Sequence, residues 1–351
     1  MTDFYTLTVA GVNKQTDDSV VVLLDVPPEK EQQFNFHPGQ HLTIKAEVNG
    51  EELRRCYSIC SSPQQQQLEI GIKAIPEGRF SNYAVKELQA GDQLEVMTPQ
   101  GHFGFTPEAG QQKNYLGIAV GSGITPVLSM LKSALEQEQD STFTLLYGNR
   151  NANSMMFRNE LLGLKNRYPQ RLHINYFFSR ETNDVPLWNG RLDGAKLREL
   201  GKGLFDWSQF DACYICGPEE IFEDCYTALV EGGLSEENYH AERFNTTSKP
   251  REKSLNQSEN TLVKIKRDGR KMTIDMTSQD DSLLDAALRQ GVDLPYACKG
   301  GVCATCICKV NSGEVEMATN YSLESDQIDN GYVLSCQTVP TSSEIEIDFD
   351  V

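Results

Sequence analysis

Apolar and polar residues alternate along the first hundred residues of the chain, and this period of two predicts β-strands. The segments HLTIKAEV (41–48) and LEIGIKAI (68–75) change polarity at most positions, as a strand does when one face packs on a core. Asn49-Gly50 follows the first segment, and this pair is typical of a tight hairpin turn. We therefore predict a small antiparallel barrel, a fold that removes exposed strand edges and suits ligand binding.

The pattern changes in the middle of the chain, where short apolar runs alternate with helical stretches. Four runs predict strands: YLGIAV, TFTLLYG, LHINYFF and ACYIC. The helical stretches that follow them begin near Pro126, Met155, Ala195 and Pro218. Strands that alternate with helices in this way form a parallel sheet, so we predict an α/β domain.

A polar segment separates this region from a third one. NTTSKPREKSLNQSEN (245–260) has one aliphatic residue, Leu255, and is typical of a linker. After it, LVKIKRDGRKMTID predicts a hairpin that turns at Asp268-Gly269, and SLLDAALRQ predicts a short helix closed by Gly291. The expected fold is multidomain α+β. Its predicted parts are an antiparallel β-barrel (1–108), a parallel α/β domain (109–243), a linker (244–260) and a β-grasp domain (261–351).

Length and charge exclude several classes of function. The 351 residues allow two or three domains, and the formal net charge of -18 opposes binding to nucleic acid or anionic lipid. The start, MTDFYTLTV, lacks the basic and apolar parts of a signal peptide, and the most apolar window, Tyr115 to Leu131, is interrupted by glycines and a proline. We therefore expect a cytoplasmic protein without a membrane span, in a compartment where disulfides are rare.

Four cysteines near the C-terminus have the spacing of a plant-type 2Fe-2S site, C-x4-C-x2-C followed by a distant cysteine. These metal-ligand candidates are Cys298, Cys303, Cys306 and Cys336. Gly300 and Gly301 permit left-handed turns in the loop, and the small residues Ala304 and Thr305 let backbone amides approach the cluster sulfurs. Zinc is the alternative metal for these four thiolates, although zinc sites usually take their thiolates from two C-x2-C pairs.

The other cysteines are weaker candidates. Cys213 and Cys216 have the spacing of a redox dithiol, but they lie in a predicted strand, whereas redox dithiols lie at helix N-termini. We expect Cys213 in the core and Cys216 at the carboxyl edge of the sheet, where ligands of open α/β sheets bind. Four more cysteines are interpreted as small packed residues: Cys56, Cys60, Cys225 and Cys308.

Charge is uneven near the C-terminus. After Lys309 the chain has no Lys or Arg, whereas nine Asp or Glu residues follow, from Glu314 to Asp350. Two interpretations remain open: a solvated acidic face, or a surface that docks to an electron acceptor.

The motif GSGITP, from Gly121 to Pro126, follows the first strand of the α/β domain. Gly121 and Gly123 would let backbone approach a pyrophosphate, Thr125 would cap the next helix, and Pro126 suits the first helical position. The third glycine of a dinucleotide fingerprint is missing. The strand-turn-helix context nevertheless favours a nucleotide site.

Cationic residues follow the next two strands. Arg150 lies in YGNR, and Ser179 and Arg180 lie in FFSRE, where they would clamp a 2′-phosphate and favour NADPH. Glu181 could instead hold a free ribose hydroxyl. NADH therefore stays an alternative.

Two short motifs in the barrel region fit a phosphate and a ring system. In RCYS, a strand would place Arg55 and Tyr57 on one face and Ser58 on the other, so that a guanidinium and a phenol grip the ligand. In GRFSNYAVKEL, Gly78 gives a flexible turn and Ser81 starts a helix whose free amides would point at an anion.

RCYS, GRFS, GSGITP, CGPEE and the cysteine loop, in this order, resemble the ferredoxin reductase-type flavoproteins with a fused C-terminal ferredoxin, over essentially the whole chain. The resemblance implies FAD, NADPH and a 2Fe-2S cluster. It implies that Ser58 lies beside the flavin, Cys216 beside the nicotinamide, and Glu242 and Phe244 near the flavin. The catalytic candidates are Ser58, Cys216 and Glu242. The cofactor-binding candidates are Arg55, Tyr57, Ser58, Lys73, Gly78, Arg79, Phe80, Ser81, Gly121, Gly123, Thr125, Arg150, Ser179, Arg180, Cys216 and Phe244.

Within that family, LPYACKGGVCATC and GEVEMATNYSLESDQIDNGYVLSCQ resemble reductase components of ring epoxidases that act on phenylacetyl-CoA. This implies electron transfer from NADPH through FAD and the cluster to a di-iron oxygenase, the expected partner, with no binding of the CoA thioester by this chain. Alternatives are a reductase for a Rieske hydroxylase or an acyl desaturase, a redox sensor, and a zinc-stapled flavin reductase. The sequence leaves FMN and the oligomeric state open.

Overall fold

The computed structural model describes residues 4–244 and 260–350, which divide into two compact units. One unit comprises Phe4–Leu53 and Tyr57–Phe244, and the other consists mainly of the C-terminal residues and includes Arg54–Cys56. The linker predicted at 244–260 lies largely outside the described residues, apart from its end residues.

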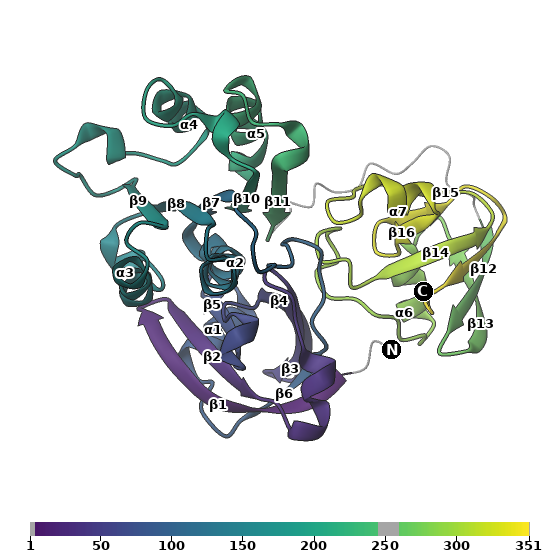
Figure 1. The fold of residues 1–351 in the computed structure, drawn as a ribbon. Coiled ribbons are helices and arrows are strands. Elements are labelled where there is room, and N and C mark those ends of the chain that lie inside the picture. The colour runs from purple at the N-terminus through teal and green to yellow at the C-terminus, as the bar shows by residue number, and fades with distance from the viewer. Residues whose placement is uncertain (1–3, 245–259, 351) are drawn as a thin grey trace. The chain divides into compact units, whose positions relative to one another are not determined.

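Six antiparallel strands form the first sheet, in the order β4-β3-β6-β1-β2-β5 (Figure 1). They are β1 (Phe4–Thr16), β2 (Ser19–Asp25), β3 (His41–Val48), β4 (Glu51–Ser58), β5 (Leu68–Lys73) and β6 (Gln93–Met97). Asn49 and Gly50 have φ values of 54° and 78° and join β3 to β4, as the hairpin prediction requires. A bridge between Ile59 and Ile70 connects the two edges of the sheet, which confirms the predicted barrel architecture.

The helix α1 (Arg79–Lys86) contacts β2, β3 and β5 of the barrel. Its Phe80 is 1% exposed and belongs to the barrel core with Leu42, Ile44 and Ile59. The helix begins at Arg79 after the N-cap Gly78, so Ser81 is its third residue and the prediction that Ser81 starts it was wrong.

Five parallel strands form the second sheet, in the order β11-β10-β7-β8-β9. They are β7 (Asn114–Val120), β8 (Thr142–Asn149), β9 (Leu172–Phe178), β10 (Ala212–Gly217) and β11 (Tyr239–Arg243). The helices α2 (Ile124–Gln137) and α3 (Arg158–Arg167) cover one face, and α4 (Gly194–Gly201) and α5 (Phe222–Glu231) cover the other (Figure 1). The four predicted strands are confirmed, whereas the sequence did not predict β11.

Short 3-10 helices occupy several connections of this unit. They are η1 (Pro28–Phe34), η2 (Pro63–Gln65), η3 (Gly121–Gly123), η4 (Ala152–Ser154), η5 (Pro186–Trp188), η6 (Trp207–Gln209), η7 (Glu219–Ile221) and η8 (Glu236–Asn238). Two of them, η3 and η7, follow β7 and β10 directly, at the edge of the sheet where ligands of α/β folds bind.

Buried polar side chains bond α2 to the barrel. Lys132, 2% exposed, donates to the carbonyl oxygen of Cys60 at 3.0 Å and pairs with Glu160. Ser129 donates to the carbonyl oxygen of Ser61 at 2.6 Å. Because an unpaired buried charge or hydroxyl is costly, these bonds fix the barrel against α2.

The C-terminal unit contains a five-stranded sheet in the order β13-β12-β18-β14-β16 and a two-stranded sheet, β15-β17. The strands are β12 (Asn260–Arg267), β13 (Arg270–Thr277), β14 (Ile307–Ser312), β15 (Val315–Met317), β16 (Tyr332–Leu334), β17 (Thr338–Pro340) and β18 (Glu344–Asp348), and the helices are α6 (Leu283–Arg289) and α7 (Ser325–Asp329). Asp268 and Gly269 turn the β12–β13 hairpin with φ values of 51° and 70°. The predicted hairpin and the predicted helix are thus confirmed.

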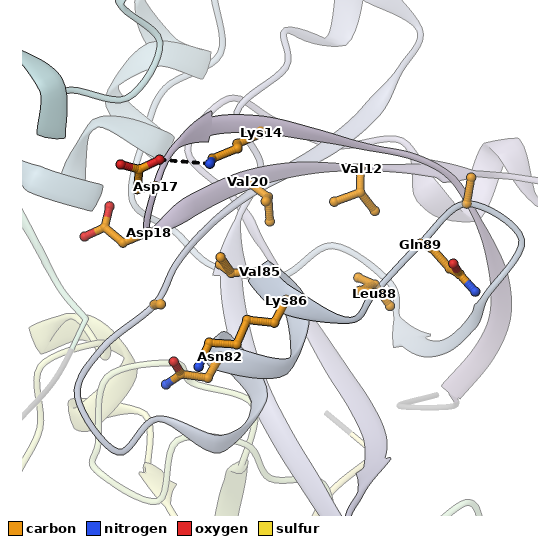
Figure 2. A pocket seen from close by; sticks show the side chains of 12 residues that line it. Val12, Lys14, Asp17, Asp18, Val20, Asn82, Val85, Lys86, Leu88 and Gln89 are labelled. Carbon is orange, nitrogen blue, oxygen red and sulfur yellow. Dashed lines mark hydrogen bonds and ion pairs between the residues drawn. The ribbon is translucent and has the colours of Figure 1, made fainter.

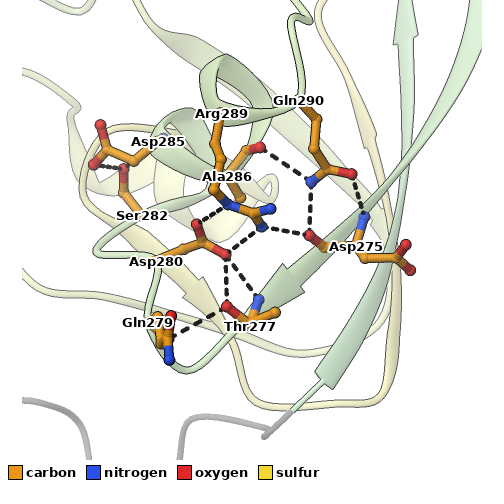
Figure 3. A network of polar contacts seen from close by, with 9 residues as sticks. All are labelled: Asp275, Thr277, Gln279, Asp280, Ser282, Asp285, Ala286, Arg289 and Gln290. Carbon is orange, nitrogen blue, oxygen red and sulfur yellow. Dashed lines mark hydrogen bonds and ion pairs between the residues drawn. The ribbon is translucent and has the colours of Figure 1, made fainter.

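A polar network ties α6 to the end of β13 (Figure 3). Arg289 binds both carboxylate oxygens of Asp280, at 2.7 Å and 2.8 Å, and Asp280 accepts a bond from the backbone amide of Thr277 at 2.8 Å. The hydrogen bonds from Arg289 hold the pKa of Asp280 below its usual value. Asp280 therefore stays ionised and anchors the helix that precedes the cysteine loop.

Candidate electron-transfer site

The three predicted catalytic residues lie together in the N-terminal unit. Cys216 and Glu242 are register partners on the parallel strands β10 and β11. Ser58, at the end of β4, donates its hydroxyl to the Glu242 carboxylate at 3.4 Å. Loss of solvation raises the pKa of Glu242 to about 7, while the charge of His41 and the bond from Ser58 act in the opposite direction. The site thus holds a half-buried carboxyl that can exchange a proton near neutral pH.

Cys216 is a neutral thiol at this position. It is fully buried, and burial together with the nearby Glu242 raises the pKa of its thiol well above the usual value. The side chain can therefore pack against a bound ring but does not serve as a thiolate nucleophile. Phe244, which follows β11, packs against the same core cluster that contains Cys216.

The turn between β7 and α2 packs tightly against Cys216. A Cβ added at Gly123 would stand 2.1 Å from the carbonyl oxygen of Cys216, so only glycine fits there. Gly121 differs, because its φ is 59° and an added Cβ would meet no described atom within 4 Å. Approach to a pyrophosphate, predicted for both glycines, stays a prediction for Gly121. Gly123 in addition makes the close contact between η3 and β10, and its approach to a pyrophosphate also stays a prediction.

The predicted start of the following helix was wrong by a few residues. The helix α2 begins at Ile124, with Gly123 at its N-cap position. Thr125 is buried inside the first turn, where its hydroxyl donates to the carbonyl oxygen of Ser122 at 3.0 Å. Pro126 is the third helical residue instead of the first. The turn η3 precedes α2 without a break, and its last residue, Gly123, takes the N-cap position that was predicted for Thr125.

The predicted flavin-binding face is formed by β4 and the start of α1. Arg55 is exposed and Tyr57 is half-buried, with the Tyr57 ring 5.6 Å from the ring of Phe80. The Phe80 side chain lies in the barrel core, so only its backbone amide is left to face an anion. Ser81 donates to the carbonyl oxygen of Gly78 at 3.4 Å and accepts a bond from a backbone amide. The hydroxyl of Ser81 thus shapes the turn, and flavin contact by these residues stays a prediction.

Two predicted cofactor-binding cations already have protein partners. Lys73 donates to the carbonyl oxygen of Ser154 at 3.1 Å and lies 3.5 Å from the Asp18 carboxylate. Arg79 pairs with Glu51 at the start of β4. A phosphate at either position would have to compete with these ion pairs or join them.

The predicted 2′-phosphate residues lie at adjacent strand ends. Arg150, Ser179 and Arg180 are exposed, and the backbone amide of Arg180 donates to the carbonyl oxygen of Arg150 at 2.8 Å. The carboxylate of Glu181 accepts a bond from the backbone amide of Ala152 at 2.8 Å. Two guanidinium groups therefore follow neighbouring strands. The carboxylate of Glu181, next to Arg180, is already bound to the first backbone amide of η4.

The cysteine loop has the left-handed residues that a tight wrap requires, and Gly301 is one of them, as predicted. Lys299, Gly301 and Ala304 have φ values of 53°, 76° and 52°, so the role predicted for Gly300 belongs to its neighbours. The backbone amide of Gly300 instead donates to the Cys298 sulfur at 3.3 Å. The approach of backbone amides to the cluster sulfurs, predicted at Ala304 and Thr305, stays a prediction.

Among the four candidate ligands, Cys298 bonds to Cys303 and Cys306 bonds to Cys336, while Cys303 also bonds to Cys56. A hydrogen bond with Cys303 and burial raise the pKa of Cys298, and a hydrogen bond between Cys306 and Cys336 raises the pKa of Cys306 and lowers that of Cys336. Each iron of a 2Fe-2S cluster takes two protein thiolates, so this pairing fits the cluster. Among the remaining cysteines, Cys56 is half-buried and the others are buried, as expected: Cys60, Cys213, Cys225 and Cys308.

Part of the acidic C-terminal charge is neutralised within the unit. Lys266 on β12 lies 2.8 Å from Asp348 on β18, and Lys264 pairs with Glu344 on the same two strands. Docking of an acceptor to the acidic residues from Glu314 to Asp329 stays a prediction.

A pocket of about 570 Å³ lies on the barrel between the β1–β2 hairpin and α1 (Figure 2). Its polar lining includes Lys14, Asp17 and Lys86, and the first two form an ion pair at 2.8 Å. Of the described residues, none that the sequence proposed for the site lines this pocket.

Sequence reasoning missed His41. This histidine is buried at the start of a barrel strand, and its burial can be seen only in the tertiary structure.

Barrel, parallel sheet and cysteine-bearing β-grasp unit define a class of protein, the NAD(P)H-dependent flavin and iron–sulfur oxidoreductases. Residues 7–105 match the oxidoreductase FAD-binding domain, residues 118–227 the oxidoreductase NAD-binding domain, and residues 265–341 the 2Fe-2S iron-sulfur cluster binding domain. The chain is 51% identical to one of the subunits of 1,2-phenylacetyl-CoA epoxidase from Escherichia coli K12, over 100% of this chain and 99% of that protein. It belongs to the family of reductases of oxygenase systems.

A more distant relative and a solved structure are also similar to this chain, the structure in its fold. The ferredoxin reductase component of 3-ketosteroid-9-alpha-monooxygenase from Rhodococcus rhodochrous is 32% identical over 98% of this chain and 96% of its own length. The solved structure of phthalate dioxygenase reductase shares the fold, with a TM-score of 0.57, 23% identity, and coverage of 99% of this chain and 98% of that one. Within 4–244 and 260–350, no helix is long and apolar enough to cross a membrane.

Proposed function

We propose that this chain is the reductase component of a phenylacetyl-CoA epoxidase and passes electrons from NADPH through FAD and a 2Fe-2S cluster to the di-iron oxygenase component. The observation that carries the proposal is the 51% identity to the Escherichia coli protein over the full length of both chains. The ketosteroid monooxygenase reductase from Rhodococcus rhodochrous is only 32% identical, which favours the epoxidase over that monooxygenase as the electron acceptor. The proposed compartment is the cytoplasm.

The proposed roles follow the geometry of the N-terminal unit. FAD, when bound, supplies the conversion of a two-electron hydride into single electrons. Ser58 and Glu242 would lie at the flavin and Cys216 at the nicotinamide, supported by the Ser58–Glu242 bond and by the Cys216–Glu242 register. A neutral thiol packs against the nicotinamide without adding charge beside it. Small errors in hydride distance slow transfer steeply, so these packed residues would fix the rate.

The remaining cofactor residues are proposed in the same way. Arg55, Tyr57 and the amides after Gly78 would hold the flavin, and the turn at Gly121 would face the nucleotide pyrophosphate. Arg150 and Arg180 would bind the 2′-phosphate of NADPH, supported by their exposure at adjacent strand ends. The proposed domains remain 1–108 for FAD, 109–243 for NADPH and 261–351 for the cluster.

Reconstitution with the purified oxygenase component tests the proposal. With NADPH and phenylacetyl-CoA, the full chain should support oxygen uptake coupled to loss of the thioester substrate. Cys303→Ser should abolish this uptake. The variant should still use NADPH to reduce a small artificial acceptor that takes electrons directly from the flavin. No uptake with the oxygenase, despite rapid reduction of the small acceptor, would assign the chain to another oxygenase such as a Rieske hydroxylase. Lack of both activities would overturn the reductase function itself.

A further inference from the structure

Gln337 directly follows the candidate ligand Cys336, and its side chain bonds two segments of the C-terminal unit. The Nε2 atom donates to the carbonyl oxygen of Lys299 at 2.9 Å and to the Cys336 sulfur at 3.7 Å. A carboxamide nitrogen carries two hydrogens, so it can make both bonds at once. Sulfur is larger than oxygen, which accounts for the longer of the two distances. The side chain therefore joins the fourth cysteine to the loop that carries the other three.

The position of the Gln337 carboxamide is fixed by its own backbone and by packing. The backbone amide of Gln337 donates to the carbonyl oxygen of Leu334 at 2.8 Å, and its carbonyl oxygen accepts a bond from the amide of Ala318 at 2.8 Å. A Cβ added at Gly301 would stand 3.3 Å from the Cγ atom of Gln337. The stem of the side chain thus packs against the cysteine loop at a glycine, and the carboxamide is held where it meets the sulfur.

Lys299 is anchored a second time, through its own side chain. Its φ of 53° places it in the left-handed region, which a non-glycine residue adopts only when neighbours hold it there. Its Nζ atom binds the Asp285 carboxylate at 2.9 Å, and the hydroxyl of Ser282 donates to the same carboxylate at 2.7 Å. This ion pair does not involve Gln337. A variant that loses the carboxamide therefore keeps an anchor for the loop and should still assemble the cluster.

A donor on a ligand sulfur acts on the electron affinity of the cluster. When bound, a 2Fe-2S cluster takes one electron from the reduced flavin and gains one negative charge, with no bond formed or broken. The added charge reaches the ligand sulfurs, so an N–H donor stabilises the reduced form more than the oxidised form. Cys298 receives such a bond from the backbone amide of Gly300, which any residue except proline would supply. The bond from Gln337 depends instead on the type of side chain.

We propose that Gln337 is a positioning residue that raises the reduction potential of the 2Fe-2S cluster through its bond to the Cys336 sulfur. The inference deepens the proposed function and rests on it. A higher potential draws electrons from the flavin onto the cluster, where the oxygenase takes them up. The second bond, to the Lys299 carbonyl, keeps the Nε2 atom of Gln337 directed at the sulfur.

A redox titration of the full chain tests the inference without an acceptor protein, with the electron paramagnetic resonance signal of the reduced cluster as the readout. Gln337→Met keeps the length of the side chain and removes both N–H donors. At a fixed potential, its ratio of reduced to oxidised cluster should fall about threefold or more, which places its midpoint about 28 mV or more below that of the wild type. Gln337→Glu adds a negative charge as well, so its midpoint should lie lower still.

Gln290→Met is the matched control. Gln290 lies in the same unit, and its carboxamide donates to the carbonyl oxygens of Asp275 and Ala286 at 2.7 Å and 3.1 Å (Figure 3). The variant loses the same number of N–H bonds, but both are bonds to carbonyl oxygens. Its midpoint should equal that of the wild type. A shift as large as that of Gln337→Met would overturn the inference, because it would reflect a general loosening of the unit.

An unchanged midpoint in Gln337→Met, with the cluster present, would also overturn the inference. Should Gln337→Met lose its cluster, the wild type with isotopically labelled glutamine side-chain nitrogens supplies a second measurement. Its reduced cluster should show a hyperfine coupling to a glutamine amide nitrogen, and the absence of this coupling would refute the bond. If the wild type supports oxygen uptake by the epoxidase and the midpoint stays fixed, only this inference fails. If the wild type supports no uptake, the proposed function fails even when the midpoint shifts.

Discussion

The hydroxyl of Ser58 donates to the carboxylate of Glu242 across 3.4 Å, although 184 residues of chain separate them. Ser58 ends a strand of the barrel, and Glu242 lies on the last strand of the parallel sheet. This bond joins the predicted flavin side of the site to the predicted nicotinamide side. Its geometry, and that of Cys216 beside it, leads to measurable consequences.

Glu242→Gln should stabilise the protein at alkaline pH. The folded-state pKa of Glu242 is raised to about 7 from 4.5, so between these values the folded state holds a proton that the unfolded state has lost. Stability contributed by this group is therefore complete below about pH 4.5 and is lost as the pH rises through 7. We expect the variant to gain about 1–2 kcal/mol at about pH 8, a value discounted for partial exposure. Thermal unfolding from pH 4 to 8 measures it.

The exposed Glu237 provides the control for this experiment. Glu237→Gln should follow the wild-type curve at every pH. A Glu242→Gln curve parallel to that of the wild type would show that the Glu242 carboxyl is ionised in the ordinary range.

Gly123→Ala should distort the site through a steric clash alone. The added methyl would stand 2.1 Å from the Cys216 carbonyl oxygen, and relief requires η3 or β10 to move. We expect a loss of about 1–3 kcal/mol in stability and at least about tenfold slower flavin reduction by NADPH. Stopped-flow absorbance at the flavin band measures the rate. At Gly203 an added Cβ meets no described atom within 4 Å, so Gly203→Ala should reduce flavin at the wild-type rate.

Cys303→Ser should remove the cluster while leaving the flavin in place. Cys303 belongs to one of the two thiol pairs, and a serine oxygen is a poor ligand for this iron–sulfur site. We expect loss of red-brown absorbance and of the electron paramagnetic signal after reduction. Cys308→Ala is the matched control, because Cys308 is also buried and lies two residues past Cys306. If Cys308→Ala also lost the cluster, the ligand assignment would need revision.

Arg180→Ala should lower the preference for NADPH over NADH. Removal of an exposed guanidinium at the strand end costs a charged bond to the 2′-phosphate, and we expect the ratio of kcat/KM values to fall about tenfold or more. Arg167, exposed at the end of α3, supplies the control Arg167→Ala, which should keep the ratio. Equal ratios in wild type and Arg180→Ala would remove Arg180 from nucleotide recognition.

Local pattern was enough to predict most of the architecture. Alternation and the pairs Asn49-Gly50 and Asp268-Gly269 determine strands and turns through nearest-neighbour sterics, so those predictions agree with the structure. The strand β11 escaped notice because YHAER has neither a long apolar run nor a clear alternation. Its pairing with β10, a tertiary contact, makes it a strand.

The site was predictable as a set of residues but not as a set of roles. The close contact of Gly123 with the carbonyl oxygen of Cys216 could not be predicted, because the two residues lie far apart in the sequence. Lys299 and Ala304 adopt left-handed conformations that their residue types disfavour, and only the fold of the loop imposes them. His41 gave no motif at all, since its neighbours Ser58 and Glu242 come from other strands.

The bonds from α2 to the barrel, made by Lys132 and Ser129, also bear on protein engineering. A fragment cut near residue 108 would leave the carbonyl oxygens of Cys60 and Ser61 without their donors and would uncover an apolar face. The flavin and nucleotide modules are therefore poor units for exchange between reductases. A chimera joined after Phe244 keeps both modules together and exchanges only the C-terminal electron carrier.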